Sequence, residues 1–191
     1  MRMALVPAGL FLLLPLSLVA QTTPKAELFG GYSFVRIEER SLHGWDVSLA
    51  GNFNKNLGFV AEASGHYGSE TFSDILGTTD SKLSFHSFLF GPRVSERSLK
   101  WFTPFAHALL GFSRVHKEID RTGNPATAIS LSADTSSFAM ALGVGLDVAG
   151  DSPVSFRIVQ VDYFLLRPEG VKSEGVRISS GLVFRFGQRQ D

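Results

Sequence analysis

The chain contains no cysteine, and other scarce residues narrow its possible functions further. Its 191 residues include two tryptophans and three tyrosines, against 17 phenylalanines and 19 glycines. Without cysteine the chain cannot form a disulfide framework, a thiolate metal site or a cysteine nucleophile. Because its 18 basic and 18 acidic side chains cancel, no excess positive charge favours nucleic acid as a partner. The length suits one domain with a core of its own.

The first twenty residues carry almost no charge. Arg2 precedes an apolar run from Met3 to Ala20, which two prolines interrupt and a polar segment follows. A positive start, a short apolar stretch and a small final residue are typical of a cleavable secretory signal peptide. We therefore predict a signal peptide at 1–20 and an exported domain at 21–191. A membrane anchor is the alternative interpretation of the same run.

Beyond residue 20, apolar and polar side chains alternate along most of the sequence. Phe138, Met140 and Leu142, for example, alternate with Ala139 and Ala141. A period of two is typical of β-strands whose two faces differ, and strands of this length suit a tilted crossing of a bilayer. The alternation predicts eight strands, at 26–36, 43–53, 57–68, 82–94, 102–115, 136–148, 154–166 and 175–186.

Short connections between the predicted strands alternate with connections that are mostly longer and polar. This order is typical of up-and-down transmembrane barrels, which have short periplasmic turns and longer outer loops. The short connections are 54–56, 95–101 and 149–153, and the others are 37–42, 69–81, 116–135 and 167–174.

Small residues gather on the polar face of the predicted strands, as at Ser48, Gly143 and Gly181. A narrow membrane barrel places bulky apolar side chains toward lipid and packs small or charged ones inside. The sequence therefore predicts an all-β, closed eight-stranded antiparallel transmembrane barrel with an apolar exterior. In the fourth strand, Phe85 and Leu89 compete with Phe88 for the lipid face, and the pattern leaves both assignments open.

Three segments carry a resemblance to a known family: 27–34, 91–93 and 177–186. Together they resemble the eight-stranded outer-membrane β-barrels, the OmpA-like transmembrane domain in its single-domain form. The resemblance implies a place in the outer membrane, contact with its lipids, and insertion by the barrel insertion machinery. It implies no single activity. Phe184 and Phe186 match the family's terminal insertion signal, although five residues follow the second aromatic.

Charged and histidine side chains fall on the predicted lumen face. Because an unpaired buried charge is very costly, we expect them to form a polar network that plugs the lumen. A proton-linked gate or a narrow conduit is the alternative. Arg157 and Asp162 have opposite parity, so both point inward only if a β-bulge lies near 158–159. The predicted network comprises Asp46, Glu62, His66, His107, Arg157, Asp162, Arg177 and Arg185.

Aromatic residues near the strand ends predict two girdles at the membrane interfaces. The outer girdle would contain Tyr32, Phe34, Trp45 and Tyr67, and the inner one Trp101, Phe102, Phe105 and Phe186.

We find no strong catalytic, cofactor or metal pattern in the sequence. Ser64 and His66 share a face with Glu62, but that face is predicted to line the lumen, where no lipid chain reaches. The histidines lack metal-ligand spacing. We therefore expect no cofactor, no metal and no catalytic residue.

The predicted function is a structural or adhesive role at the cell surface, with ligand recognition through the loops at 69–81 and 116–135. Two other functions stay open. A soluble, exported, lipocalin-like barrel would bind a small apolar ligand and would need its apolar faces inward. A lipid-modifying outer-membrane enzyme would need a reactive Ser64.

Overall fold

The computed structural model describes residues 23–37, 40–74, 77–99, 101–123, 129–148, 153–167 and 173–189. The predicted signal peptide lies outside these residues. Among the residues described, no helix is long and apolar enough to span a bilayer.

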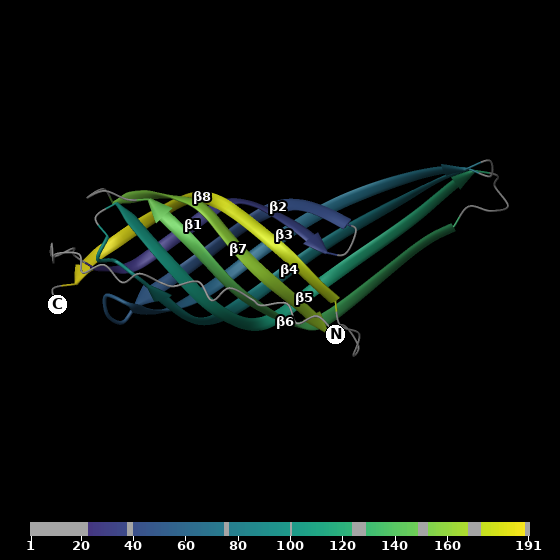
Figure 1. Ribbon diagram of the computed structural model, residues 1–191. Helices are drawn as coiled ribbons and strands as arrows, with labels where there is room; N and C mark the ends of the chain where they lie inside the picture. Colours follow the sequence, from purple (N-terminus) through teal and green to yellow (C-terminus); the bar gives the residue numbers. More distant parts are fainter. Residues whose placement is uncertain are drawn as a thin grey trace, which may run out of the picture.

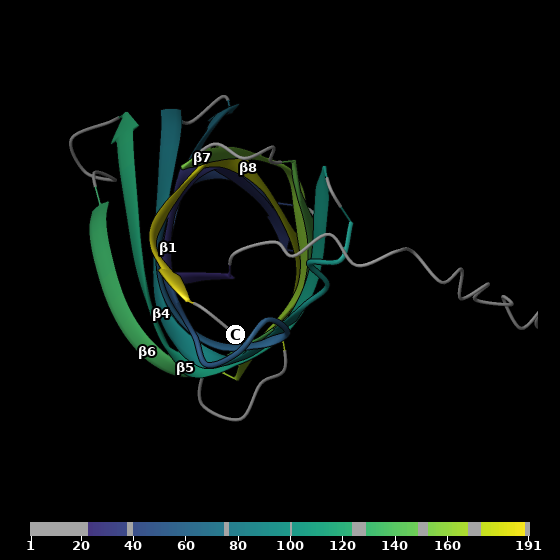
Figure 2. The same cartoon turned by 90° about the vertical axis from the view of Figure 1, so that its left-hand side faces the viewer.

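Eight antiparallel strands form a closed barrel in which each strand pairs with its neighbours in sequence and β1 pairs with β8 (Figures 1 and 2). This confirms the predicted up-and-down topology. We call the end with the β2–β3 and β4–β5 connections the turn end, and the opposite end the hairpin end. The strands are β1 (Thr23–Ile37), β2 (Arg40–Asn52), β3 (Leu57–Asp74), β4 (Gly77–Ser95), β5 (Phe102–Gly123), β6 (Ile129–Val148), β7 (Val154–Arg167) and β8 (Ser173–Arg189).

The predicted loops at 69–81 and 116–135 are wrong for most of their length. Strands β3 and β4 stay paired up to Asp74 and Gly77, and β5 and β6 up to Arg121 and Ile129. Four strands therefore project beyond the others at the hairpin end (Figure 1). Alternation did not mark these extensions because both faces of a sheet standing in water can be polar, so no face needs apolar residues.

The exterior of the barrel is apolar and its interior is polar. Leu142 and Val144 on β6 are exposed, whereas Asp162 and Arg177 are fully buried in the lumen. A lipocalin-like barrel needs the opposite arrangement, so this alternative is overturned. The structure also settles which face of the fourth strand points outward. Phe85 and Leu89 are buried, and Phe88 is exposed on the lipid side.

The predicted bulge in β7 is confirmed. Along the ladder with β8, Arg157 pairs with Gly181 and Gln160 with Ser179, so Ile158 and Val159 face a single residue. The extra residue changes the parity of the strand. As a result, Arg157 and Asp162 are both buried inside the barrel.

A layer of buried apolar side chains lies in the lumen toward the hairpin end. It contains buried side chains from several strands, among them Val35 of β1, Leu42 of β2, Phe85 of β4 and Phe164 of β7. The rings of Phe85 and Phe164 meet edge to face, with centroids 5.5 Å apart. The polar part of the lumen lies between this layer and the turn end.

Candidate functional site

Arg177 of β8 lies at the centre of a buried ion-pair cluster. Its Nη2 lies 2.7 Å from Asp162 Oδ2 and 2.5 Å from Glu62 Oε1, while its Nε donates a 2.8 Å hydrogen bond to Asp162. The three residues come from β8, β7 and β3, and Asp162 stands directly opposite Arg177 in the ladder. One guanidinium thus links carboxylates from separate parts of the barrel wall.

Asp162 has further partners inside the lumen. His107 Nε2 lies 2.7 Å from its Oδ1, and Gln160 Nε2 donates to its Oδ2 over 2.9 Å. Gly143 faces this cluster, and a Cβ at that position would collide with Asp162 Oδ1 and His107 Nε2. The lumen therefore requires the smallest residue at this point of β6.

Ser64 and His66 each have a hydrogen-bond partner on another strand. His66 Nε2 lies 2.8 Å from Ser33 Oγ, and Ser64 Oγ lies 2.7 Å from Ser87 Oγ. Both residues are buried in the lumen. Among the residues described, no group of three or more histidine, aspartate and glutamate side chains is arranged to hold a metal ion.

Asp46 is fully buried opposite Ser64 on the neighbouring strand, in the same part of the lumen as Arg177. Arg157 lies closer to the turn end, where its Nε donates a 2.8 Å hydrogen bond to Asp147. The structure therefore places Asp46, Glu62, His66, His107, Asp162 and Arg177 in one region, and Arg157 and Arg185 in another.

Sequence reasoning missed several members of this second region. Arg93 pairs with Glu27 over 3.1 Å and with Asp147 over 3.2 Å, and all three are buried. Glu27 and Asp147 could have been found, because both share the parity of lumen-facing neighbours. Arg97 could not, because it lies in the connection after β4, where no alternation indicates a direction.

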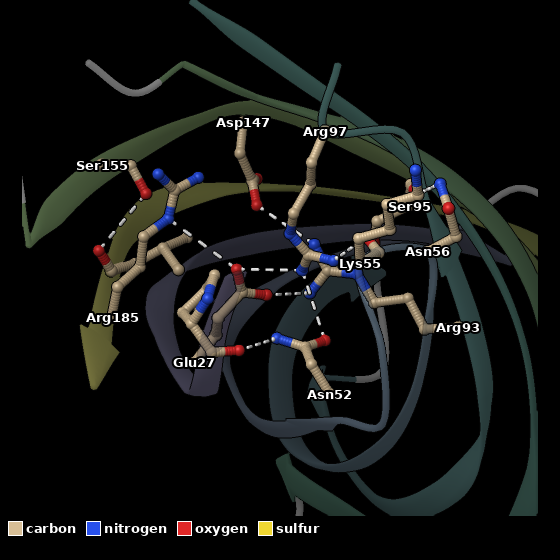
Figure 3. Close-up of polar contacts among 12 residues, drawn as sticks. Glu27, Asn52, Lys55, Asn56, Arg93, Ser95, Arg97, Asp147, Ser155 and Arg185 are labelled. Atoms are coloured by element: carbon tan, nitrogen blue, oxygen red, sulfur yellow. Dashed lines mark hydrogen bonds and ion pairs between the residues drawn. The ribbon is translucent and has the colours of Figure 1, made fainter. Parts of the chain in front are cut away.

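Arg97 folds back into the turn end of the barrel (Figure 3). Its Nη2 lies 3.2 Å from Glu27 Oε1 and 3.2 Å from Asn52 Oδ1, while its Nη1 donates a 2.8 Å hydrogen bond to the Lys55 carbonyl. It therefore ties two connections at this end to a buried carboxylate.

The predicted girdle residues Tyr32, Trp45, Tyr67, Trp101 and Phe102 are all exposed. The prediction for Phe105 is wrong, because the residue was expected in the inner girdle but is buried in the lumen. The guanidinium groups of two arginines lie over its ring, at 4.0 Å for Arg93 and 4.4 Å for Arg157. Cation–π contact explains why an aromatic residue occupies this face.

Phe184 and Phe186 are exposed on β8, which continues past both aromatics to Arg189. Phe186 pairs with Ala26 and Phe184 with Leu28, so both belong to the β1–β8 seam that closes the barrel.

The projecting sheet is a second candidate site, made of β3 and β6 at its edges and β4 and β5 between them. Among the described pairs, β3 stays with β2 up to Tyr67, and β6 pairs with β7 from Phe138 onward. Residues 68–74 and 129–137 are therefore the edges of a sheet that stands above the barrel wall (Figure 1).

Polar pairs cover the outer face of the projecting sheet. His116 Nδ1 lies 3.1 Å from Asp134 Oδ1, and Arg114 Nε lies 3.5 Å from the same oxygen. The hydrogen bond from His116, together with the Arg114 charge, holds the pKa of Asp134 below its ordinary value. Lys82 and Glu118 form a looser pair at 3.9 Å.

The sequence matches no known family and no functionally curated protein. Its structure is similar to that of Ail, the attachment invasion locus protein of Yersinia pestis, with 17% identity, a TM-score of 0.58, and coverage of 85% of this chain and 99% of Ail. Neisserial surface protein A is 16% identical, with a TM-score of 0.57 and coverage of 84% and 96%. The outer-membrane protein OprG of Pseudomonas aeruginosa is 13% identical, with a TM-score of 0.54 and coverage of 86% and 97%.

These similarities show that the chain has the fold of the small outer-membrane β-barrels, as the resemblance in its sequence implied. The apolar exterior is the surface that such a barrel presents to lipid. Fold and exterior together are those of an outer-membrane protein.

Proposed function

We propose that this protein is a non-enzymatic surface-interaction protein of the outer membrane that recognises an extended polypeptide segment through its projecting sheet. The observation that carries the proposal is the edge of β6. Residues 129–137 pair with β5 on one side, and the described ladder with β7 begins only at Phe138. An unpaired edge presents backbone donors and acceptors that an added strand can satisfy.

The β6 edge has few of the features that usually block strand addition. Charged residues, proline and bulges protect natural edges, and residues 129–137 contain no lysine and no proline, with Asp134 as their one charged residue. The β3 edge is shorter, and Arg40 approaches Glu70 on it to 4.0 Å. We therefore assign the interaction to β6 rather than to β3.

An exposed apolar side chain stands on each edge of the projecting sheet, Leu131 on β6 and Phe72 on the opposite edge, β3. Both have the parity of the lumen-facing residues on their strands, so they lie on the inner face of the projecting sheet. Exposed apolar groups of this kind suit alternate side chains of a bound strand.

The charge of the outer segments supports a peptide-like partner over a polysulfated one. Ail has been crystallised with the heparin analogue sucrose octasulfate. In this chain, residues 69–81 and 116–135 contain six acidic and two basic residues, which would repel a polyanion.

The test uses the mature chain in lipid nanodiscs and a library of random peptides as long as the β6 edge. We expect enrichment of peptides with alternating apolar residues, and we expect Ser132→Lys to weaken their binding by at least about tenfold, because a charged edge resists strand addition. Sucrose octasulfate, used as a second probe, should not compete with these peptides.

Ser69→Lys is the matched control, because it places the same charge on the other edge. If Ser69→Lys abolishes peptide binding and Ser132→Lys does not, the interaction belongs to β3. If no peptide is enriched and sucrose octasulfate binds, strand addition is the wrong mode.

For the lumen, we propose that the polar network and the apolar layer above it close the barrel to solutes. Side chains fill narrow eight-stranded barrels, and the paired charges here join opposite walls. Planar-bilayer recordings of the refolded protein should show no steady conductance. Open-channel current in the wild-type protein would contradict this.

We also propose that Phe184 and Phe186 form the insertion signal. Their outward position near the end of the last strand leaves both rings accessible before the barrel closes. Replacing Phe186 with serine should reduce assembly by the purified insertion machinery, while Phe156→Ser, at an exposed aromatic on β7, should reduce it less.

A further inference from the structure

The turn end of the lumen holds more positive than negative charge. Four arginines gather there around two carboxylates, and Figure 3 shows Arg93, Arg97 and Arg185 among them. The arginines are Arg93, Arg97, Arg157 and Arg185, and the carboxylates are Glu27 and Asp147. This group carries two positive charges in excess locally, and the carboxylates that offset them, Asp46, Glu62 and Asp162, share Arg177 farther along the lumen. The turn end itself is therefore the positive end of the polar lumen, where an anion from solvent is favoured.

The carboxylates are already shared by three of the arginines. Asp147 forms ion pairs with Arg157 and Arg93, with nitrogen–oxygen distances of 2.8 Å and 3.2 Å. Glu27 forms ion pairs with Arg93 at 3.1 Å and with Arg97 at 3.2 Å. The aromatic rings inside the barrel also lie against Arg93 and Arg157. These contacts leave little negative charge for the fourth arginine.

Arg185 is that fourth arginine. Its Nε lies 3.7 Å from Glu27 Oε1, beyond hydrogen-bond range (Figure 3). Its side chain is 16% exposed, against 3% for Arg93 and 6% for Arg97, so it lies at the entrance of the cluster. Solvent therefore reaches the arginine of this cluster that has the fewest partners among the described residues.

Arginine N–H donors without hydrogen-bond acceptors lie in the same cluster as Arg185. Among the described residues, the buried Nε–H groups of Arg93, Arg97 and Arg185 have no hydrogen-bond acceptor, although Glu27 Oε2 beside them has no donor either. Buried donors of this kind are normally satisfied, and guanidinium groups match oxyanions through two parallel hydrogen bonds. Excess charge, vacant donors and solvent access coincide at Arg185.

From this arrangement we infer that the turn-end mouth of the barrel binds a small oxyanion, a phosphate or carboxylate group, held by Arg185 with Arg97 beside it. This site is independent of the projecting sheet and of the partner proposed for it. Because it lies at the opposite end of the barrel, either proposal can fail without affecting the other.

The test measures binding of inorganic phosphate to the mature chain, refolded in a maltoside detergent that contains no phosphate. Adding the protein should broaden the phosphorus NMR line of free phosphate. Arg185→Gln should weaken the affinity at least about tenfold, since it removes charge-assisted hydrogen bonds. Acetate should compete with phosphate if a carboxylate shares the site.

Arg114→Gln is the matched control, because it removes one positive charge from the exterior of the barrel, on β5. It should leave the broadening unchanged. No broadening with the wild-type protein, or equal broadening with Arg185→Gln, would overturn the inference.

A second measurement separates binding from a merely structural role of Arg185. Phosphate should raise the thermal unfolding midpoint of the wild-type barrel above its value in chloride at equal ionic strength, by about 3 °C or more. Arg185→Gln should lose this difference while staying folded in chloride. If instead it lowers the midpoint equally in both salts, Arg185 is structural and the anion site is rejected.

Discussion

Arg177 and Asp162 face each other across the β7–β8 ladder with both side chains fully buried and 2.7 Å between Nη2 and Oδ2. Glu62 completes the contact from the other side of the lumen. The pair therefore joins the last two strands of the barrel to β3, far away in the sequence. Its contribution depends on every member being present, because a buried charge without its partner is more costly than a pair.

Replacing Arg177 with leucine should destabilise the folded barrel by about 3–5 kcal/mol, since Asp162 and Glu62 would lose their shared counter-charge. Urea unfolding in detergent, followed by tryptophan fluorescence, measures this. Arg114→Leu removes an exposed ion pair and should leave the midpoint nearly unchanged. Equal effects of the two substitutions would show that the lumen network does not hold the walls together.

The boundary between the lipid belt and the projecting sheet can be tested on a single strand. Val144 and Leu131 both lie on β6 and both are 60% exposed. Val144→Arg should cost about 2–4 kcal/mol, because it places a charge in the bilayer. Leu131→Arg should cost far less, because Leu131 lies on the inner face of the projecting sheet, where the side chain meets water rather than lipid.

Stability of both variants would be compared in lipid vesicles by urea titration. A large cost at Leu131 together with a small cost at Val144 would mean that the membrane position derived from the exterior is wrong.

Gly143 should tolerate no side chain. Alanine at this position would meet Asp162 Oδ1 and His107 Nε2, and we expect a loss of about 1–3 kcal/mol from overpacking of the lumen. Gly51→Ala is the matched control on another strand, because a Cβ there has nothing within 4 Å. Thermal unfolding followed by circular dichroism distinguishes them, and a neutral Gly143→Ala variant would contradict the packing described here.

Residues 21–191, refolded without the predicted signal peptide, should change their mobility on a detergent gel after boiling. A closed ladder from β1 to β8 leaves no open edge around the membrane part of the barrel, and closed barrels of this kind resist detergent until heated. Unboiled and boiled samples run side by side give the answer. A chain that shows no shift and stays folded without detergent would contradict a membrane barrel.

Alternation alone was enough to predict most of the fold. In β6, Phe138 and Leu142 lie outside and Ala139 and Ala141 inside, as their positions two apart required. The bulge near 158–159 was also predictable, because two charged residues of opposite parity both had to avoid lipid. These features depend on a local rule, namely that neighbouring side chains of a strand point in opposite directions.

The projecting sheet and the turn-end cluster could not be predicted in the same way. Strand β6 extends past its last β7 partner in water, where no apolar face is required, so its sequence resembles a polar loop. Arg97 enters the barrel from a connection that has no alternation. The inward position of Phe105, by contrast, was predictable, because Phe105 lies two residues from His107 and shares its lumen-facing parity.

The sequence by itself determined that the chain forms eight strands, which faces of the second, sixth and eighth meet lipid, and that charged residues must occupy the lumen. Each of these follows from local periodicity and from the cost of exposing charge to a bilayer. Only the tertiary structure decided which charges pair. Partners such as Glu62 and Arg177 lie on strands far apart in the sequence, and closure of the barrel sets the distance between them.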